Sequence, residues 1–504
     1  MTKYYIFVFI KHKKIFYMTK VVVLGAGIAG HTAVLNLKRK LKKKAEITVI
    51  SPNENYQWVP SNIWVGTGQM KPEQIYFPLK PVYEKIGVDF RLARAISIHP
   101  EGDAGENKPY VSIEYVNSEK QGQKDKVYYD YLINATGPKL NFEATPGLGP
   151  ETGNTVSICN YEHASQAWAK LQETIEKMKK GQKQRIVIGL GHGGATCQGA
   201  ALEYTMNVAA LIKKLKLDDK AEIHYITNEF FIGDLGMAGA YVKFNNYIAH
   251  TRDLVASMFY EYGIKWHNQA SVYKIEPGKI FYETYSGEEK VLEYDFAMLI
   301  PQFTGVGITA TGPNGEDYTP KLFKPNKLMI VDADYESAKK PYHEWTGDDW
   351  PKKLQNPTYP NIFAIGIAFA PPHTISKPFK TPSGRPLTPA PPRTGMPSAV
   401  MAHATALNIA EWILTGKPSF KHKASMAEIA SVCVVSIRYG LRGLAGTMSV
   451  YPTIPDYKKY PDFGRDIRYT IGEIGSAGHW FKWLMHYLFL WKAKVKPFWY
   501  LIPD

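Results

Sequence analysis

The sequence predicts an α/β fold made of two tandem Rossmann-like dinucleotide-binding domains, followed by a C-terminal amphipathic helical region. Two observations predict the paired domains. A strand, a glycine-rich turn and a helix follow one another at residues 20–43, and again at residues 185–217. The third observation is a concentration of aromatic and basic residues at 465–504. With 504 residues, 45% of them hydrophobic, the chain has room for about three domains with buried cores.

The first unit begins with an apolar strand at residues 20–24, which runs directly into the glycine-rich stretch 25–30. A helical stretch extends from there to about residue 43, and the next strand is expected at 46–50. Glycines in such a turn allow a pyrophosphate to approach the backbone, and the helix N-terminus supplies unpaired N–H groups. This order predicts a dinucleotide site far more specifically than the glycine spacing alone.

The second unit has a strand at 185–188, a turn carrying Gly189, Gly191 and Gly194, a helix to about 217 and a strand at 222–227. Between the two units, residues 129–137 form an apolar strand that ends in Ala-Thr-Gly. Residues 361–366 are expected to return as a strand beneath the first site. Two such folds in one chain predict a flavoprotein with two dinucleotide-binding domains.

The domain boundaries follow from these units and from changes in composition. Residues 336–360 and 371–397 are rich in proline, lysine and turn residues, so we expect long loops there. Residues 1–17 are interpreted as an upstream start or a frayed tail, because no cleavage site follows their short apolar run. The expected parts are a first FAD-domain part, a second Rossmann-like domain, a second FAD-domain part and a C-terminal region, at 18–150, 151–328, 329–414 and 415–504.

Charge and cysteine content exclude several classes of protein. The net charge of +15 predicts an anionic partner, either lipid headgroups or nucleic acid. Because the basic residues form no recognised nucleic-acid motif, we expect no nucleic-acid partner. Three cysteines exclude a disulfide-built scaffold, and no apolar run reaches the roughly 18 residues that a spanning helix needs. No metal site is expected.

Residues 465–504 hold ten aromatic residues, among them four tryptophans, and six lysines or arginines. Aromatic rings interleaved with bases are typical of a segment that lies in a membrane interface. The alternative is a C-terminal helix that packs on its own protein. The sequence therefore predicts a peripheral or monotopic membrane protein whose partner is a lipid surface.

The three cysteines occupy distinct contexts. Cys159 precedes the second unit, Cys197 follows its glycine turn by three residues, and Cys433 lies in a short apolar strand. A lone cysteine is ordinarily a small buried hydrophobe. A thiol at the start of a helix, however, is favoured as thiolate by the helix dipole. Cys197 also stands where an NADH enzyme would hold pyrophosphate, which favours thiol chemistry over nicotinamide chemistry in this unit.

These motifs together resemble those of the sulfide:quinone oxidoreductases, which are related to type II NADH dehydrogenases and to flavocytochrome c sulfide dehydrogenase. The resemblance spans roughly residues 18 to 497. It rests on the first glycine motif, the stretches ATGPK at 135–139 and RTGM at 393–396, FLWK at 489–492, and the contexts of the three cysteines.

The resemblance implies roles for individual residues. Cys197 and Cys433 resemble the redox pair that holds sulfur, Cys159 resembles a third cysteine that in some members bonds covalently to the flavin, and Glu203 resembles a proposed proton acceptor. A surface carboxylate is the alternative for Glu203, and a hydrogen-bonded structural residue is the expectation for His163. The implied FAD-binding residues are Gly25, Gly27, Ile28, Ala29, Gly30, Ser51, Ala135, Thr136, Gly137, Cys159, Gly366, Ile367, Thr394 and Gly395.

The implied quinone-binding residues are Val432, Lys482 and Met485. Met485 stands where members use an aromatic ring, and Asp234 stands where they carry a histidine. Ser51 replaces the acid that ordinarily binds the adenosine ribose, and Ile367 replaces an aspartate that would bind the ribityl chain.

The implied function is oxidation of hydrogen sulfide to polysulfide or elemental sulfur, with two electrons passing through FAD to a quinone in a homo-oligomeric, membrane-associated enzyme. One alternative is an NADH:quinone oxidoreductase, which needs a working nicotinamide site in the second unit and leaves the cysteine pair without a role. Another is a non-catalytic FAD-binding membrane module.

Overall fold

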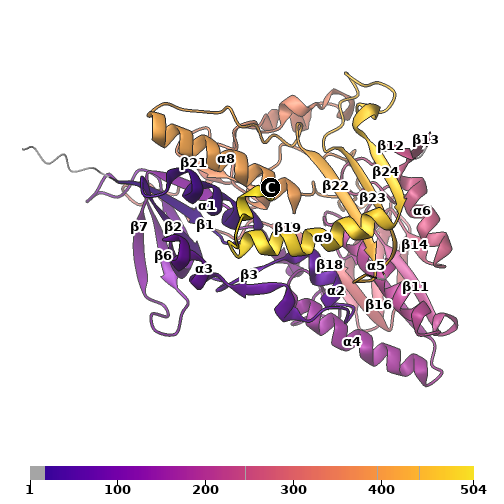
Figure 1. The fold of residues 1–504 in the computed structure, drawn as a ribbon. Coiled ribbons are helices and arrows are strands. Elements are labelled where there is room, and N and C mark those ends of the chain that lie inside the picture. Colours follow the sequence, from indigo (N-terminus) through magenta and orange to yellow (C-terminus); the bar gives the residue numbers. More distant parts are fainter. Residues whose placement is uncertain (1–17, 245, 394, 442) are drawn as a thin grey trace, which may run out of the picture.

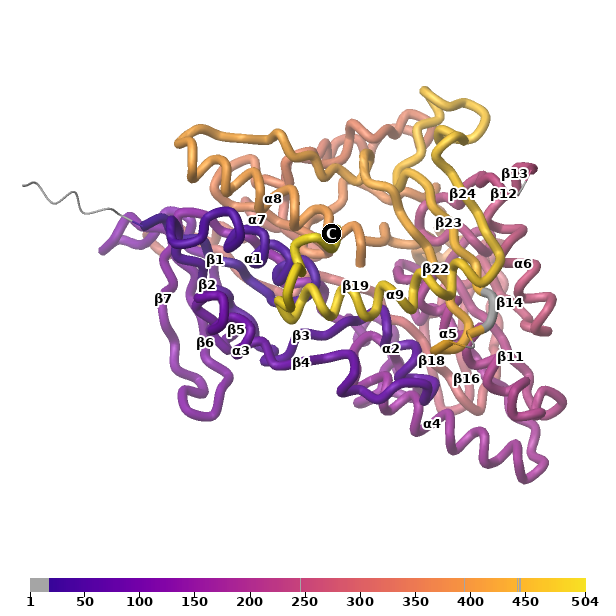
Figure 2. The backbone as a smooth tube through the Cα atoms, viewed as in Figure 1, coloured from indigo at the N-terminus to yellow at the C-terminus, as the bar shows by residue number. Residues whose placement is uncertain are grey.

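The computed structural model describes residues 18–504 except 245, 394 and 442, so the tail expected at 1–17 lies outside the described residues. Figure 1 shows two α/β bodies, one built mainly from the N-terminal third of the chain and one from its middle. The C-terminal segment runs across both, and the tube in Figure 2 shows the same path without side chains.

The first sheet has the order β21-β8-β1-β2-β5-β6-β7, and β20 pairs with β5. β1 (Thr19–Leu24) lies parallel between β2 (Ala45–Ser51) and β8 (Tyr131–Asn134). β21 (Ile362–Ala364) pairs parallel with β8, so the expected return strand does join this sheet. The remaining members are β5 (Asp89–His99), β6 (Tyr110–Tyr115), β7 (Lys124–Tyr128) and β20 (Thr309–Ala310).

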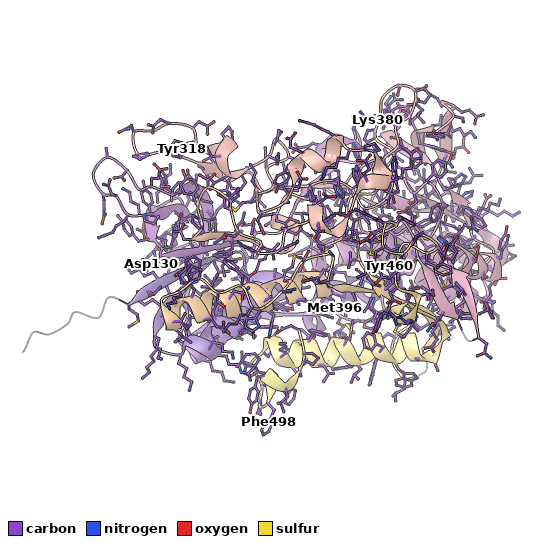
Figure 3. The ribbon with its side chains drawn as sticks, turned by 90° about the horizontal axis from the view of Figure 1, so that it is seen from above. Asp130, Tyr318, Lys380, Met396, Tyr460 and Phe498 are labelled. Carbon is purple, nitrogen blue, oxygen red and sulfur yellow. The ribbon has the colours of Figure 1, made fainter. Side chains whose placement is uncertain are left out.

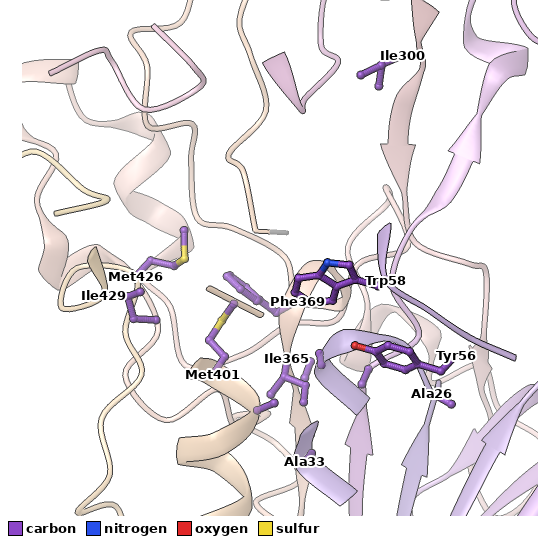
Figure 4. Close-up of a cluster of buried hydrophobic side chains, with 14 of the residues drawn as sticks. Ala26, Ala33, Tyr56, Trp58, Ile300, Ile365, Phe369, Met401, Met426 and Ile429 are labelled. Carbon is purple, nitrogen blue, oxygen red and sulfur yellow. The ribbon is translucent and has the colours of Figure 1, made fainter. Parts of the chain in front are cut away.

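Two helices pack together beside this sheet. α1 (Ile28–Leu41) follows the glycine turn directly, and α8 (Met396–Thr415) packs along it. Most residues that α1 buries are small or aliphatic, such as Ala33, Val34 and Leu37, and this allows close packing on the strands. Figure 4 shows the buried cluster where Ala33, Ile365 and Met401 meet the aromatic rings of Tyr56, Trp58 and Phe369.

The second sheet has the order β14-β11-β10-β18 and is parallel throughout. Its strands are β10 (Gln184–Leu190), β11 (Ala221–Ile226), β14 (Lys265–His267) and β18 (Phe296–Ile300). α4 (Tyr161–Lys179) and α5 (Gln198–Lys214) pack on it, and α6 (Thr251–Glu261) connects β13 to β14. Both predicted glycine turns thus follow the first strand of a parallel sheet.

The C-terminal part differs from the expected helical region, because much of it is β-structure. A five-stranded sheet of order β13-β12-β24-β23-β22 joins two distant parts of the chain. Its strands are β12 (Tyr241–Phe244), β13 (Tyr247–His250), β22 (Ala430–Ile437), β23 (Leu444–Pro452) and β24 (Ile471–Gly475). Only then does α9 (Ser476–Ala493) begin. Of these strands the sequence predicted the short apolar one around Cys433, whereas β24 lies in the aromatic-rich stretch 465–504, whose composition indicated a helix.

Short elements complete the fold. The long segments 336–360 and 371–395 contain, among their described residues, only 3-10 turns and isolated bridges. The other helices are α2 (Asn62–Val65), α3 (Leu79–Ile86) and α7 (Thr319–Leu322). The other strands are β3 (Asn55–Gln57), β4 (Tyr76–Pro78), β9 (Lys139–Asn141), β15 (Ala270–Glu276), β16 (Lys279–Thr284), β17 (Glu289–Glu293) and β19 (Gln302–Thr304).

Candidate active site

One cavity of about 1490 Å³ connects the first glycine turn, all three cysteines and the inner face of α9. Its walls come from both α/β bodies and from the C-terminal segment that crosses them (Figure 2). A cavity of this volume is larger than most small-molecule sites, so it can hold more than one ligand. Residues that line this cavity, such as Gly25 and Asp504, are more than 450 positions apart in the sequence.

The dinucleotide end of the cavity is built from the turn between β1 and α1. Gly25 has a φ of +94°, and a Cβ there would lie 2.3 Å from the carbonyl oxygen of Ala135. Gly27 caps α1 without any side-chain hydrogen bond, so the first N–H groups of α1 face the cavity. The expected residues that line this end are Gly25, Gly27, Ile28, Ala29, Ser51, Ala135, Thr136, Gly137, Ile367 and Gly395. These residues fit a bound FAD.

Two of the expected FAD-binding residues, Gly30 and Gly366, lie behind the cavity wall. A Cβ on Gly30 would lie 2.0 Å from the carbonyl oxygen of Gly25, so this glycine lets α1 approach the turn. Gly366 has a φ of +64° and is wedged between Ala29 and Ser398. Neither lines the cavity. Thr394 lies outside the described residues.

The hydroxyl of Ser51 already forms a local hydrogen bond, because the backbone N–H of Asn53 donates to Ser51 Oγ at 3.1 Å. Ser51 still lines the cavity, and so do Glu54 and the exposed Arg94. A carboxylate and a guanidinium are therefore available at the end where an adenosine ribose and its phosphate would lie. Arg94 was not expected from the sequence.

Cys197 is the N-cap residue of α5, and its backbone is left-handed with a φ of +74°. A non-glycine residue in this conformation is uncommon and tends to occur where the surrounding structure enforces a geometry for function. The N–H groups of Ala200 and Ala201 both donate to the Cys197 carbonyl, at 3.0 and 3.2 Å. The thiol thus lies at the positive end of a 17-residue helix, as the sequence predicts.

Cys433 lies on β22, which packs against α5. A Cβ built on Gly199 would lie 3.4 Å from the Cys433 Sγ, so this thiol touches the first turn of α5, two residues after Cys197. Burial, helped by the nearby carboxylates of Glu203 and Glu229 and opposed by Lys482, raises the pKa of Cys433 to about 12. Cys433 is therefore protonated at neutral pH unless a base removes the proton.

Cys159 and His163 line the same cavity on the side of α4. Burial raises the pKa of Cys159 to about 11. The His163 ring packs edge-on against Phe142 at 5.8 Å, and its Nδ1 is buried without a hydrogen-bond partner among the described residues. The expectation of a hydrogen-bonded structural histidine is wrong for this nitrogen, because α4 turns the imidazole against an aromatic ring.

Glu203 is 3% exposed, which excludes a surface carboxylate. It forms a buried ion pair with Lys482 of α9 and accepts a hydrogen bond of 3.0 Å from the Ser436 backbone N–H. Burial raises the pKa of Glu203, and Lys482 and the Ser436 N–H act in the opposite direction. The ion pair joins α5 to α9 across the strand that carries Cys433.

The end of the cavity beneath α9 is apolar apart from this ion pair. Val432, Met485 and Lys482 line it, together with Trp58 and Phe489, whose rings are stacked at 5.0 Å with an interplanar angle of 10°. Lys482 also lies 5.3 Å from the centre of the Trp64 ring. This end offers flat aromatic walls and one cationic donor, although Met485 itself is not aromatic.

The outer face of α9 carries a stripe of half-exposed apolar side chains at helical spacing. Its members are Trp480, Phe481, Leu484, Tyr487, Leu488 and Trp491. Phe481, Leu484 and Leu488 also line the cavity, so the cavity borders this stripe. Figure 3 shows Phe498, just after α9, projecting away from the body of the molecule. Within residues 18–504, the described helices include none that is both long and apolar enough to cross a membrane.

Residues 386–390 of the same chain cover the second glycine turn. A Cβ on Gly193 would lie 1.8 Å from the Pro386 carbonyl oxygen, and the Thr388 N–H donates to the Gly193 carbonyl at 3.0 Å. The Ala390 N–H likewise donates to the Ala195 carbonyl at 3.1 Å. The proline-rich segment predicted as a loop thus lies where a pyrophosphate would approach the turn, which could not be foreseen from its composition.

Comparison with known proteins is informative at this point. The family model described as pyridine nucleotide-disulphide oxidoreductase matches residues 19–310. The chain belongs to this family. The sulfide-quinone reductase of Aquifex aeolicus is 29% identical, over 94% of this chain and 91% of that protein. The mitochondrial sulfide:quinone oxidoreductase of Dictyostelium discoideum is 23% identical over 61% of each chain. These matches confirm the resemblance stated from the motifs.

Solved structures agree with this assignment. The X-ray structure of the A. aeolicus sulfide:quinone oxidoreductase aligns with a TM-score of 0.71 and 27% identity, covering 94% of this chain and 91% of that one. The Plasmodium falciparum NDH2 in complex with NADH aligns with a TM-score of 0.61 and 16% identity, covering 97% and 99%. At that identity the second alignment shows a shared fold only.

Several residues of the site were missed by sequence reasoning. Trp58, Glu54 and the segment Ile502, Pro503 and Asp504 all line the cavity. Asp504 accepts from His403 at 2.6 Å and pairs with Lys492, so the last residues of the chain fold back over α1 and α8. No local signal marks these residues, because each contributes through a tertiary contact.

Proposed function

We propose that this protein is a flavoenzyme that oxidises sulfide and passes two electrons through FAD to a quinone, at the surface of a membrane. The observation that carries the proposal is the placement of Cys197 and Cys433. Two thiols that are 236 positions apart in the sequence lie on adjoining elements in one cavity with a dinucleotide cradle. The similarity to sulfide:quinone oxidoreductases over nearly the whole chain supports the same function.

The cysteine chemistry follows from thiol–disulfide exchange. Hydrosulfide attacks a sulfur bridge held between the two cysteines, so that one S–S bond forms as another breaks. One cysteine then carries a persulfide and the other is a thiolate. Re-forming the bridge around the new sulfur removes two electrons and releases the persulfide proton. FAD, when bound, accepts these two electrons and delivers them to the quinone.

The residues beneath α9 suit the quinone. Stacked aromatic walls at Trp58 and Phe489 accept a flat ring, and the Lys482 ammonium can donate to a quinone carbonyl. A quinone dissolved in lipid would reach this end from the apolar stripe of α9, because the stripe and the cavity share side chains. We therefore propose that α9 lies in the membrane interface, with the half-buried Lys494 and the exposed Lys496, which follow α9, facing lipid headgroups.

Two geometric observations disfavour NADH as the electron donor. Residues 386–390 occupy the approach to the second glycine turn. Glu229, which follows β11 where an NADH enzyme would bind ribose, is 1% exposed and is bonded inside the protein. A non-catalytic FAD-binding module would not need two thiols on adjoining elements of one cavity, so the cysteine pair disfavours that alternative as well.

The proposal is tested by anaerobic assay of sulfide-dependent reduction of a soluble quinone analogue. Cys197→Ser and Cys433→Ser should each lower the rate by at least about 100-fold, since serine is a poor leaving group for sulfur exchange. Both variants should retain FAD, measured by absorbance. Full activity in either variant would refute the assignment of the pair.

A further inference from the structure

Sulfide oxidation as proposed above releases one proton inside the cavity each time the sulfur bridge re-forms. That proton needs an acceptor close to the cysteines. Glu203, the carboxylate expected in this role, is already engaged by the Lys482 ammonium and by the Ser436 N–H. A second buried carboxylate, Glu229, lies close enough to Cys433 for its negative charge to raise the pKa of that thiol.

Glu229 has no basic partner within hydrogen-bond distance among the described residues. Its Oε2 accepts from the Thr227 hydroxyl at 2.8 Å, and its Oε1 accepts from the Leu235 backbone N–H at 2.8 Å. Leu235 itself lines the cavity. Glu229 thus lies one layer behind the cavity wall, with only neutral hydrogen-bond donors around its carboxylate.

Another buried carboxylate, Asp234, lies close enough to Glu229 for its charge to act on it. Asp234 is 4% exposed and accepts from the Ser376 hydroxyl and from the Gly236 N–H, the latter at 2.9 Å. The nearby Arg465 is buried, and its guanidinium donates four hydrogen bonds to backbone carbonyls, including those of Met237 and Gly239. The positive charge of Arg465 therefore acts on Asp234 through space and not through a direct bond.

Two buried tyrosines connect this carboxylate pair with the cysteines. The Tyr225 hydroxyl lies 3.4 Å from the carbonyl of Gln198, the residue after Cys197; burial raises the pKa of Tyr225, and the charges of Glu229 and Cys433 add to that shift. Tyr451 is fully buried and its hydroxyl has no hydrogen-bond partner among the described residues; burial raises its pKa, and the same two groups add to the shift. A buried hydroxyl without a partner is costly, which points to a functional reason for its retention.

We infer that Glu229 takes up the proton released on the sulfur side, through the Tyr225 hydroxyl, and passes it towards Asp234 and Ser376. In this step the S–H bond of the persulfide breaks as the two cysteines close around the sulfur. Its electron pair enters the new S–S bond, two electrons leave for FAD, whose reduction draws one proton from solvent, and the persulfide proton ends on the Glu229 carboxylate. The inference rests on the proposed sulfide oxidation.

The raised pKa of Glu229 supports its role as the proton acceptor, and because the pKa of Asp234 is lower, the proton resides mainly on Glu229 before it moves on. Burial raises the pKa of Glu229 to about 8, and the neighbouring Asp234 charge contributes to this shift. A carboxylate with such a pKa can gain and lose a proton near neutral pH, as a general base must. Burial also raises the pKa of Asp234 to about 6, against hydrogen bonds from Ser376 and Gly236 and the charge of Arg465.

Glu229→Gln tests the inference, because glutamine keeps the shape and can still accept from Leu235. The matched control is Glu283→Gln, another buried carboxylate, which is held by Ser383, Thr381 and Arg385 far from the cavity. The purified holoenzyme is mixed anaerobically with sulfide between pH 5.5 and 9.5, and flavin absorbance is followed. We expect flavin reduction to slow by about 10- to 100-fold in Glu229→Gln, with loss of one ionisation from the pH profile, and no change in the control.

Two further measurements keep the inference falsifiable. At pH 9, where most of Glu229 starts as carboxylate because its pKa is about 8, infrared difference spectra of sulfide-treated minus oxidised protein should show a new protonated carboxyl band that is absent in Glu229→Gln. Tyr225→Phe should slow flavin reduction similarly while leaving the reoxidation of reduced flavin by quinone unchanged. A Glu229→Gln variant that matches the control in rate and pH profile would overturn the inference, as would an unchanged carboxyl band. Failure of the wild-type protein to be reduced by sulfide would instead refute the proposed function.

Discussion

Lys482 of α9 and Glu203 of α5 form a buried ion pair although they are 279 residues apart in the sequence. The side chains of both are less than 8% exposed. α5 begins at Cys197, and α9 carries the apolar stripe, so the pair joins the sulfur side of the cavity to the side where we propose that quinone enters.

Lys482→Met should destabilise the protein by about 3–5 kcal/mol, because it leaves the Glu203 carboxylate buried without its cation. The double variant Lys482→Met with Glu203→Gln should recover most of that loss, since neither charge then remains. Denaturant unfolding of the four proteins in a double-mutant cycle measures the coupling. Equal stability of wild type and Lys482→Met would contradict a buried pair.

Cys159→Ser separates two roles of the third cysteine. If Cys159 binds the flavin covalently, the yellow colour should stay with acid-denatured wild-type protein and wash away from the variant. If the thiol instead acts in sulfur release, turnover should fall with no change in flavin retention. Absorbance of the precipitate and of the supernatant distinguishes these results, and unchanged values for both readouts would remove Cys159 from the site.

The double variant Trp480→Ser with Trp491→Ser should weaken binding to anionic vesicles. Both rings are more than 40% exposed on α9, neither lines the cavity, and each contributes on the order of 1 kcal/mol when it enters lipid. A control pair, Tyr260→Ser with Tyr285→Ser, removes exposed rings from other elements. Vesicle sedimentation measures the effect; identical binding of both double variants would place the membrane contact elsewhere. Removing all of 465–504 would be a poor test, because it deletes β24 and Arg465.

The contribution of Glu229 and Asp234 to stability should fall as pH rises from about 4 to about 8. The pKa values of Glu229 and Asp234 are raised in the folded protein, to about 8 and about 6, so the folded state binds protons more tightly than the unfolded chain. Their contribution is therefore full below their unfolded pKa values and is lost as pH rises through the folded ones. Glu229→Gln should flatten this decline, measured as melting temperature against pH. A difference in melting temperature between wild type and Glu229→Gln that stays constant from pH 4 to pH 8 would contradict these shifts.

Much of the fold was predictable because its signals are local. The strand–glycine–helix order located β1, α1, β10 and α5, and the contexts of the cysteines indicated which of them would meet. Arg465 was counted among the bases of a membrane segment, yet it is buried, because four backbone carbonyls accept its hydrogen bonds. Such contacts depend on loops from distant parts of the chain, and no period or motif in the sequence marks them.

The central claim is that sulfide, and not NADH, reduces this protein. It rests on the cysteine pair and on the chain segment that covers the second glycine turn. The direct measurement is anaerobic stopped-flow mixing of the oxidised holoenzyme with micromolar sulfide or with NADH, following flavin absorbance. We predict rapid bleaching by sulfide and none by NADH. Rapid bleaching by NADH, with no response to sulfide, would contradict this account and favour an NADH:quinone oxidoreductase.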